Sequence, residues 1–224
     1  MRKKIILLIA VISVVYSVRS QTKFGIEAGG VYNGMFASNV EISPKFSYRV
    51  GGFVNYNQFW GSGIAYARKS AELSGFLPQY AGYIQKLDIV MNQVELVPLS
   101  LRFSAINIGR DFSITPVLSV YCLYGFSGKG TITGIDTRLS ESENTFHKEI
   151  GNLFKDSRFE EGAASYSYKG FKPFDAGGKI GVDFTYQKNY MLRFNYAAGL
   201  INLSSYDKKL RNSSLELSLC YLFP

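Results

Sequence analysis

The sequence predicts an all-β protein, an eight-stranded antiparallel up-and-down transmembrane β-barrel, and three observations lead to this prediction. The first lies between Phe174 and Leu203, where large apolar residues alternate with small or polar ones on both sides of residues 187–189. Each run is about 12 residues long, and a tilted strand needs roughly 9 to 11 to cross a bilayer. Two membrane-spanning strands joined by a tight hairpin fit this stretch.

The second observation is that no segment after residue 20 reaches about 18 consecutive apolar residues, as a membrane helix would. A closed barrel then remains as the way to satisfy every backbone group in lipid. The third is that long and short connections alternate, as in outer-membrane barrels with short periplasmic turns and long outer loops. Seven aromatic residues fall at the short-turn end, as an interfacial girdle should: Phe24, Tyr56, Trp60, Phe103, Tyr186, Tyr190 and Phe223.

Residues 1–20 are predicted to be a cleaved signal peptide, which leaves residues 21–224 as an outer-membrane β-barrel domain. A basic start is followed by an apolar run from Ile5 to Val15 and by small residues near Ser20, which is the pattern of a secretory signal. The apolar run falls short of the roughly 20 residues that a membrane anchor needs.

The first three strands are expected at Lys23 to Tyr32, Phe46 to Tyr56 and Trp60 to Lys69. In the first two, aromatic and aliphatic residues alternate with glycine and with charged residues such as Glu27 and Arg49. In the third, glycine and alanine occupy one face, which fits a crowded interior.

The fourth strand, Leu87 to Phe103, is the least regular, because its two halves differ in phase around Pro98. Proline removes a donor from the strand ladder, so a bulge beside Pro98 would return Glu95 to the polar face. The fifth strand, Asp111 to Phe126, sets leucine, valine and tyrosine against serine and threonine.

The hairpin supplies the sixth and seventh strands, Phe174 to Tyr186 and Tyr190 to Leu200. Asn212 to Phe223 closes the chain with five leucine or aromatic positions on one face, Leu215, Leu217, Leu219, Tyr221 and Phe223. The long loops are expected at residues 33–45, 70–86, 127–170 and 204–211.

The apolar face of these strands is expected to point outward. It carries most of the large Phe, Tyr and Leu side chains, which are too bulky to converge inside an eight-stranded barrel. The other face is rich in Gly, Ala and Ser with a few charges, which fits a narrow polar lumen. The competing fold is a soluble periplasmic ligand-binding barrel, which would hold the apolar face inside.

The lumen is predicted to contain a charge network. Its members are Glu27, Arg49, Arg102, Asp111, Asp175, Lys179, Asp183, Arg193 and Glu216, with Glu95 if the bulge forms. If Tyr186 pairs with Tyr190, Asp183 faces Arg193 across the hairpin, which is a favourable pair. Paired charges would block the narrow lumen as a polar plug, and an ion or solute path is the alternative.

Residues 127–170 are predicted to form a long extracellular loop with a short amphipathic helix. Ser140 and Glu143 resemble a capping box, and four apolar residues recur at helical spacing: Phe146, Ile150, Leu153 and Phe154. Two roles fit this pattern, a lid on the barrel mouth or a docking face for a protein or the membrane surface.

Other functions find little support in the sequence. The net charge of +8 falls to 8 − 4 = +4 without residues 1–20, and the cations are dispersed among acids, so no nucleic-acid partner is expected. No cofactor motif or His and Cys cluster for a metal occurs. Cys122 and Cys220 fall on opposite faces of strands that are not neighbours, so no disulfide is expected between them. Catalysis would depend on the sole histidine, His147, beside Ser140 or Ser142, and no motif fixes that arrangement.

Several of these segments resemble the PorT-like outer-membrane β-barrel proteins. The matching segments are FGIEAGGVY, VELVPLSLRF, FDAGGKIGVDF, LRFNYAAGLINL and LELSLCYLF, and the resemblance spans about Phe24 to Phe223. It implies the outer membrane of a Gram-negative bacterium, and the founding protein of the family is associated with protein secretion across that membrane. Barrels of the family usually end on an aromatic residue, whereas here Pro224 follows Phe223.

We therefore predict a non-enzymatic outer-membrane protein that acts as a binding, anchoring or assembly component, with a link to protein secretion implied by the resemblance. Its expected partners are outer-membrane lipid and a protein bound through residues 127–170. The alternatives are a soluble periplasmic ligand-binding barrel, a small-solute channel and a lipid-modifying barrel enzyme.

Overall fold

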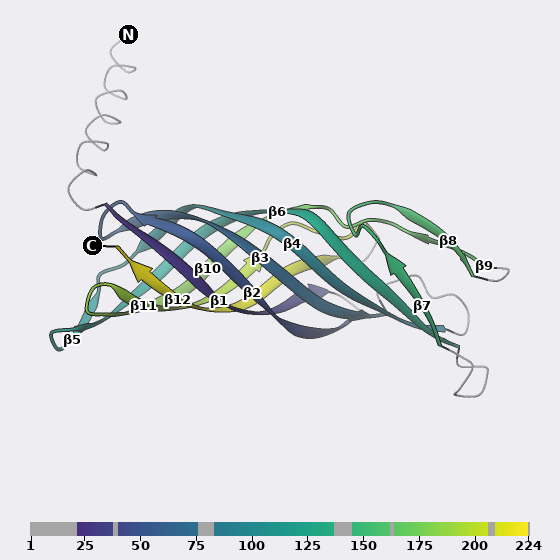
Figure 1. Cartoon of the computed structure of the whole chain (residues 1–224), viewed down its shortest axis with the longest axis horizontal. Coiled ribbons are helices and arrows are strands. Elements are labelled where there is room, and N and C mark those ends of the chain that lie inside the picture. Colours follow the sequence, from purple (N-terminus) through teal and green to yellow (C-terminus); the bar gives the residue numbers. More distant parts are fainter. Residues whose placement is uncertain are drawn as a thin grey trace, which may run out of the picture.

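The computed structural model describes residues 22–37, 40–75, 83–136, 145–161, 164–205 and 209–223. Its strands are β1 (Lys23–Ala37), β2 (Glu41–Asn55), β3 (Trp60–Ser74), β4 (Tyr83–Arg102), β5 (Ile106–Ile108), β6 (Phe112–Asp136), β7 (Thr145–Ile150), β8 (Ser157–Glu161), β9 (Ala164–Tyr168), β10 (Phe174–Tyr186), β11 (Tyr190–Gly199) and β12 (Leu210–Leu222). Within these residues, eight strands form one antiparallel ring in the order β1, β2, β3, β4, β6, β10, β11 and β12, and β12 pairs with β1 (Figure 1). The predicted eight-stranded up-and-down barrel is confirmed.

The ring closes with a stagger between its first and last strands. A path that steps from each residue to its register partner leaves β1 at Lys23 and returns to β1 at Asn33, 33 − 23 = 10 residues further on. The path runs through Lys23, Asn55, Gly61, Ser100, Ser119, Lys179, Ala197, Ser214 and Asn33. The path crosses eight pairs of neighbouring strands, so it rises by about 1.25 residues at each step. Such a stagger is expected, because the strands of a closed barrel are tilted against its axis.

The apolar face points outward along the middle of the ring strands, as predicted. Ile64, Ile180 and Leu219 are exposed on the outside, whereas the intervening Glu216 and Lys179 are buried inside. The predicted girdle residues lie at the short-turn end, where the ring of Tyr56 is 4.7 Å from that of Trp60. The soluble alternative, with the apolar face inside this part of the barrel, is therefore wrong.

A second, partial aromatic girdle, which was not predicted from the sequence, lies on β2, β3, β6 and β10 at the long-loop side of the apolar band. Its members are Phe46, Tyr48, Tyr66, Tyr124, Phe126 and Phe174. On β10 the two girdles are represented by Phe174 and Tyr186, 186 − 174 = 12 residues apart. This spacing is close to the roughly 9 to 11 residues that a tilted strand needs to cross a bilayer.

The polarity of the two faces reverses beyond this second girdle. We call residues 35–37, 41–45, 70–74, 83–92, 128–136 and 210–211 the outer section. On β3, Ala71 and Leu73 point inward and are buried, while Glu72 between them faces outward. The inward residues join one core cluster: Met35, Ala71, Leu73, Leu87, Ile89, Met91, Ile132, Ile150, Leu153, Tyr168, Phe171 and Leu210.

This reversal corrects the predicted loops. The ring strands were expected to end at Tyr32 and Lys69 and to resume at Leu87, but β1 continues to Ala37, β3 continues to Ser74 and β4 begins at Tyr83. The predicted ends mark the positions where the outward apolar face stops. The alternation itself continues with its sense inverted, so much of the expected loop is strand.

The predicted helix in the long segment is wrong for the described residues. Residues Thr145–Ile150 form β7, and Ile150 lies opposite Gly130 of β6. Ser140 and Glu143 lie outside the described residues. The described residues contain no helix that is long and apolar enough to cross a membrane. Residues 145–150 form a strand because β6 runs past the end of β10 and so has an unpaired edge to which they can hydrogen-bond. A short helix would form few hydrogen bonds, too few to offset the free-energy cost of helix nucleation.

Residues 151–155, which we call the plug turn, fill the gap that β10 leaves. The Asn152 side-chain oxygen accepts a hydrogen bond from the Phe154 N–H at 2.9 Å. The Leu153 carbonyl accepts bonds from Tyr168 Oη and from the Phe171 N–H, both at 2.8 Å. These bonds hold the turn against the inside of the wall.

Glycines on β6 make room for the plug turn. A Cβ added at Gly125 would lie 2.3 Å from the Phe154 ring, and one at Gly130 would lie 2.8 Å from Leu153. Leu153 is fully buried as a result. The lumen is therefore closed by apolar side chains at its long-loop end.

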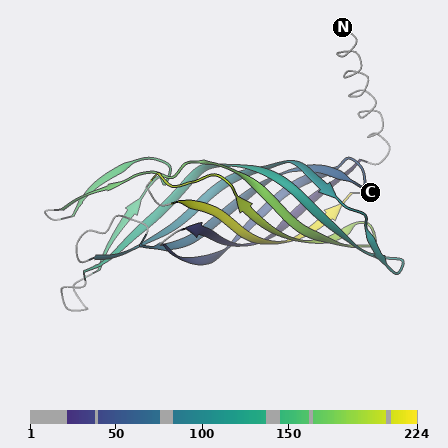
Figure 2. The ribbon, with the colours of Figure 1, turned by 180° about the vertical axis from the view of Figure 1, so that it is seen from behind.

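The remaining elements lie outside the ring. β5 pairs with the start of β6 at the short-turn end, and β8 and β9 form a separate hairpin at the long-loop end (Figures 1 and 2). Within the ring, the register of β4 against β6 shifts between Leu96 and Leu99. This irregularity confirms the bulge predicted beside Pro98, and Glu95 is buried in the lumen.

Candidate functional site in the barrel lumen

Charged side chains fill the middle of the lumen. The predicted residues that lie there are Glu27, Arg49, Glu95, Arg102, Asp175, Lys179, Asp183, Arg193 and Glu216. The exception is Asp111, which is exposed in the turn before β6, where its carbonyl accepts a bond from the Gln187 N–H at 2.8 Å. That prediction is wrong because Asp111 precedes the first register pair of β6, so strand alternation does not fix its direction.

Asp183 holds two arginines at the short-turn side of the network. It faces Arg193 in register, as predicted, and its Oδ1 accepts a bond from Arg193 Nε at 2.8 Å. Its Oδ2 accepts a second bond from Arg102 Nη1 at 2.6 Å. The Arg193 guanidinium also lies 4.7 Å from the centre of the Phe53 ring. Such charge-assisted bonds are about twice as strong as neutral ones.

Lys179 and Arg49 bind three glutamates further along the axis. Lys179 Nζ lies 2.7 Å from Glu95 Oε1 and 2.7 Å from Glu216 Oε2. Arg49 Nη2 lies 3.0 Å from Glu95 Oε1 and 2.8 Å from Glu27 Oε1. All five side chains are at most 4% exposed.

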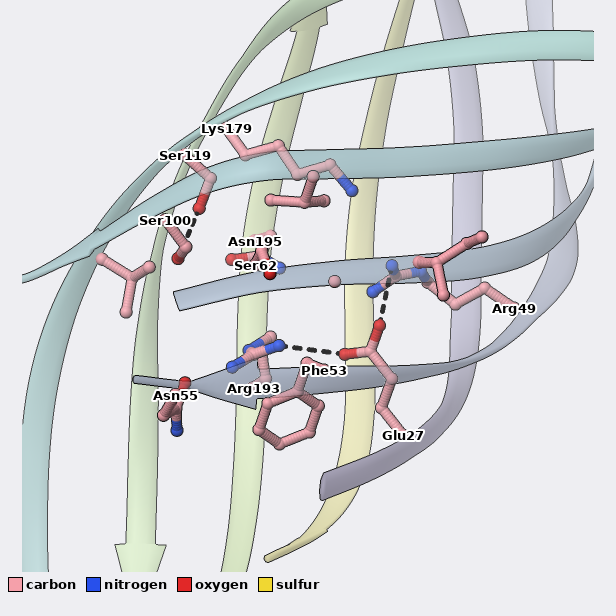
Figure 3. Close-up of a pocket in the computed structure, with 14 residues that line it drawn as sticks. Glu27, Arg49, Phe53, Asn55, Ser62, Ser100, Ser119, Lys179, Arg193 and Asn195 are labelled. Carbon is pink, nitrogen blue, oxygen red and sulfur yellow. Dashed lines mark hydrogen bonds and ion pairs between the residues drawn. The ribbon is translucent and has the colours of Figure 1, made fainter. Parts of the chain in front are cut away.

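Glu27 joins the two groups. Figure 3 shows its carboxylate between Arg49 and Arg193, and Arg193 Nη1 lies 3.0 Å from Glu27 Oε2. The ion pairs therefore run without a break from Lys179 to Arg102. With Lys69 included, the described lumen holds five cations (Arg49, Lys69, Arg102, Lys179, Arg193) and five carboxylates (Glu27, Glu95, Asp175, Asp183, Glu216), so its charges balance.

Several polar residues of the lumen were not predicted from the sequence, among them Lys69, Tyr121 and Asn195. Lys69 is buried on the same face as the alanines of β3, so the alternation alone could have found it. Tyr121 shares the inward face of β6, and its hydroxyl lies 3.2 Å from Asp175 Oδ2. Asn195 lies opposite Gly181 in register and is buried. The signal at Tyr121 was obscured because large aromatic residues were assigned to the outside.

The space left in the lumen is small. The cavity of Figure 3, between the ion pairs and a Ser100–Ser119 hydroxyl pair, has a volume of about 30 Å³. That is room for about two water molecules. A larger cavity of about 630 Å³, lined in part by Arg102, lies at the short-turn end. Among the described residues, ion pairs fill the middle of the lumen.

Three of the four residues predicted as a docking face, Ile150, Leu153 and Phe154, do not form a free surface. Ile150 and Leu153 are buried in the core cluster, and Phe154 packs against it. Their apolar spacing reflects strand and turn packing inside the barrel mouth. The backbone of Phe146 pairs with Gly134, and its side chain lies outside the described part of the structure.

The chemistry of the described residues offers no clear reaction centre. Cys122 and Cys220 are free thiols, and Cys220 is buried inside while Cys122 is partly exposed. In the described ranges, no group of three or more His, Cys, Asp or Glu residues could hold a metal ion. His147 lies opposite Thr133 in the β6–β7 register, and its side chain is not among those described.

Comparisons with known proteins give likeness in structure alone. No family model matches the chain, and no curated protein matches its sequence. A solved structure of the attachment invasion locus protein Ail of Yersinia pestis has a TM-score of 0.43 at 12% identity, covering 91% of this chain and 99% of Ail. For Neisserial surface protein A (NspA) the TM-score is 0.44 at 12% identity, covering 89% and 97%.

The outer membrane protein OprG of Pseudomonas aeruginosa is similar to the same degree. Its TM-score is 0.48 at 12% identity, and the match covers 91% of this chain and 96% of OprG. Because no family model matches, the resemblance to PorT-like proteins stays a prediction.

Proposed function

We propose that this chain is a non-enzymatic outer-membrane β-barrel protein of a Gram-negative bacterium that acts as a binding, anchoring or assembly component. The observation that carries the proposal is the reversal of polarity along single strands. On β4, the buried residues change from Leu87 and Ile89 to Glu95, while the outward residues change from Asp88 to Leu96. A barrel in water throughout would keep its apolar residues inside along its whole length.

The position of the reversal supports a membrane boundary. Most large apolar side chains that face outward on the ring strands lie between the two aromatic girdles, whereas most apolar side chains of the outer section turn inward, with the exposed Phe36 as an exception. Lipid favours apolar residues on the outside, whereas water favours them inside. The outward band with its girdles fits the apolar zone of outer-membrane barrels, which is about 25 Å tall.

The closed lumen favours a binding or structural role over transport. The ion pairs fill the middle of the barrel, and the plug turn fills its long-loop end. A solute channel would need a continuous bore, and eight strands leave little beyond side-chain packing. We further propose that the protein serves a secretion apparatus, as the PorT-like resemblance implies.

The membrane part of the proposal is tested by fractionation and gel mobility of the mature chain. We expect it in the outer-membrane fraction, with a mobility that changes on boiling because folded barrels resist detergent until heated. In planar bilayers we expect no single-channel conductance. A soluble product without heat-modifiable mobility would contradict the membrane location, and steady conductance would contradict the plugged lumen.

We also propose that a protein partner binds the segment 127–170, and the structure allows a sharp test. Ser157 and Tyr168 are register partners at the base of the β8–β9 hairpin, so a two-residue Asn-Gly turn can replace residues 158–167. This change keeps Ile150 and Leu153 in the core, which a deletion of residues 141–161 would not. We expect the barrel to stay heat-modifiable while the co-purifying partner is lost.

The matched control for this test is a hairpin of the original length. Residues 158–167 would be replaced by ten alternating serine and threonine residues, which preserves the hairpin but changes its side chains. Loss of the partner in both variants locates recognition in the side chains. Retention of the partner by the Asn-Gly variant would overturn the docking proposal.

A further inference from the structure

A second polar layer lies in the lumen between the ion-pair network and the plug turn. Six buried residues fall at nearly one height when placed by register and stagger: Asn33, Ser47, Lys69, Gln93, Asp175 and Asn212. The contacts agree, because Asn33 Nδ2 donates to the carbonyl of Ser70 at 3.4 Å, next to Lys69. Asp175 interacts with both Lys69 and Asn212. We call these six residues the upper polar layer.

The unsatisfied polar atoms of the described lumen concentrate in this layer. Five side-chain oxygens there are buried and have no hydrogen-bond partner among the described residues: Asn33 Oδ1, Ser47 Oγ, Gln93 Oε1, Asp175 Oδ1 and Asn212 Oδ1. Lys69 is 1% exposed. Its ammonium makes no hydrogen bond or ion pair within the described residues, although the carboxylates of Glu216, Glu95 and Asp175 attract it through space.

Buried polar atoms need partners, and the charges of this layer limit what those partners can be. An unpartnered buried oxygen or ammonium loses its hydration without compensation. Lys69 and Asp175 already balance each other, and the whole described lumen is neutral, so an ionic ligand would introduce an uncompensated charge. An apolar ligand would leave the oxygens unsatisfied. The partner must therefore be neutral, and it must both donate and accept hydrogen bonds.

We infer that the upper polar layer binds a cluster of water molecules that bridges the Lys69 ammonium to Asp175 and to the amide oxygens of Asn33, Gln93 and Asn212. Lys69 supplies three N–H donors, and each water accepts a hydrogen bond on one side and donates hydrogen bonds to the free oxygens on the other. Buried waters make about three hydrogen bonds each, which matches a layer with many free acceptors and one cation. The plug turn above the layer and the ion pairs below it keep these waters from exchanging freely.

The experiment is water magnetisation transfer in NMR spectra of the mature chain folded in detergent micelles. The side-chain amides of Asn33, Gln93 and Asn212 should receive magnetisation from water with the sign of long-lived bound molecules. In Lys69→Met the central donor is gone, so this transfer should be lost. The matched control is Arg68→Met, which removes the adjacent but exposed cation of β3 and should leave the transfer unchanged.

Three results would overturn the inference. They are the absence of water transfer in the wild type, transfer that persists in Lys69→Met, and transfer from detergent or another organic molecule in place of water. Should Lys69→Met fail to give a heat-modifiable barrel, a crystal structure of the wild type decides. Solvent density within about 2.7–3.2 Å of Lys69 Nζ is then expected, and its absence contradicts the water cluster.

Discussion

Replacing Lys179 by methionine should destabilise the folded barrel by about 3–5 kcal/mol, the range for removing one partner of a buried ion pair. Lys179 Nζ is shared between Glu95 and Glu216 at 2.7 Å each, and both carboxylates are about 1% exposed. Without the ammonium, these carboxylates would share Arg49 alone. The measurement is urea unfolding of the mature chain in lipid vesicles, followed by the fluorescence of Trp60, the only tryptophan.

Two further variants separate the ion pair from the general effect of losing a lysine. Lys172→Met removes an exposed lysine and should change the unfolding free energy by less than about 0.5 kcal/mol. The double variant Lys179→Met with Glu216→Met should lose less stability than the two single variants added together, by about 0.5–3 kcal/mol. Additive losses, or a Lys179→Met variant as stable as the wild type, would mean that the ion pairs of Lys179 with Glu95 and Glu216 do not hold the lumen together.

Gly177→Ala should destabilise the barrel by about 1–3 kcal/mol or more, as overpacked sites do. The added Cβ would lie 2.1 Å from the carbonyl oxygen of Ala198 and 2.8 Å from Tyr121 Oη. A backbone oxygen cannot rotate away as a side chain can, so β10 and β11 would have to separate locally. The heat-modifiable fraction and urea unfolding both report this loss.

The neighbouring residue provides a matched control. Gly178 is on the same strand and points outward, and the nearest atom to an added Cβ there is 3.8 Å away. Gly178→Ala should therefore cost nothing and could gain up to about 1 kcal/mol from the lower entropy of the unfolded chain. Equal stability of the two variants would contradict the inward direction of Gly177 and with it the assignment of faces on β10.

The sequence predicted the wall of the barrel well where residues face lipid on one side and the lumen on the other. Along Tyr190 to Gly199 and Phe174 to Tyr186, the two environments differ strongly, so the alternation has large amplitude and the register follows from it. The same reasoning paired Asp183 with Arg193 and placed Glu95 inside through a bulge at Pro98. These are local consequences of a period of two residues.

The errors occurred where the surroundings of the strand change. In the outer section the apolar residues face inward. A prediction that assigns apolar residues to the outside therefore places the ends of β1 and β3 too early in the sequence. The four-residue spacing of Ile150 and Phe154 resembled a helix, although Ile150 belongs to β7 and Phe154 to the plug turn. Whether that segment folds as strand depends on the free edge of β6, which exists only in the assembled ring.

By itself, the sequence determined the all-β class, the eight ring strands, their outward band and most of the charges inside, because alternation and burial are properties of each strand. Only the tertiary structure decided which charges meet, since Glu27, Lys179 and Glu216 come from strands far apart in the chain and their contacts depend on the ten-residue stagger. The same closure brings Lys69 close enough to Glu216, Glu95 and Asp175 for their carboxylates to attract its ammonium. Long-range register is a property of the closed ring, and no single strand carries it.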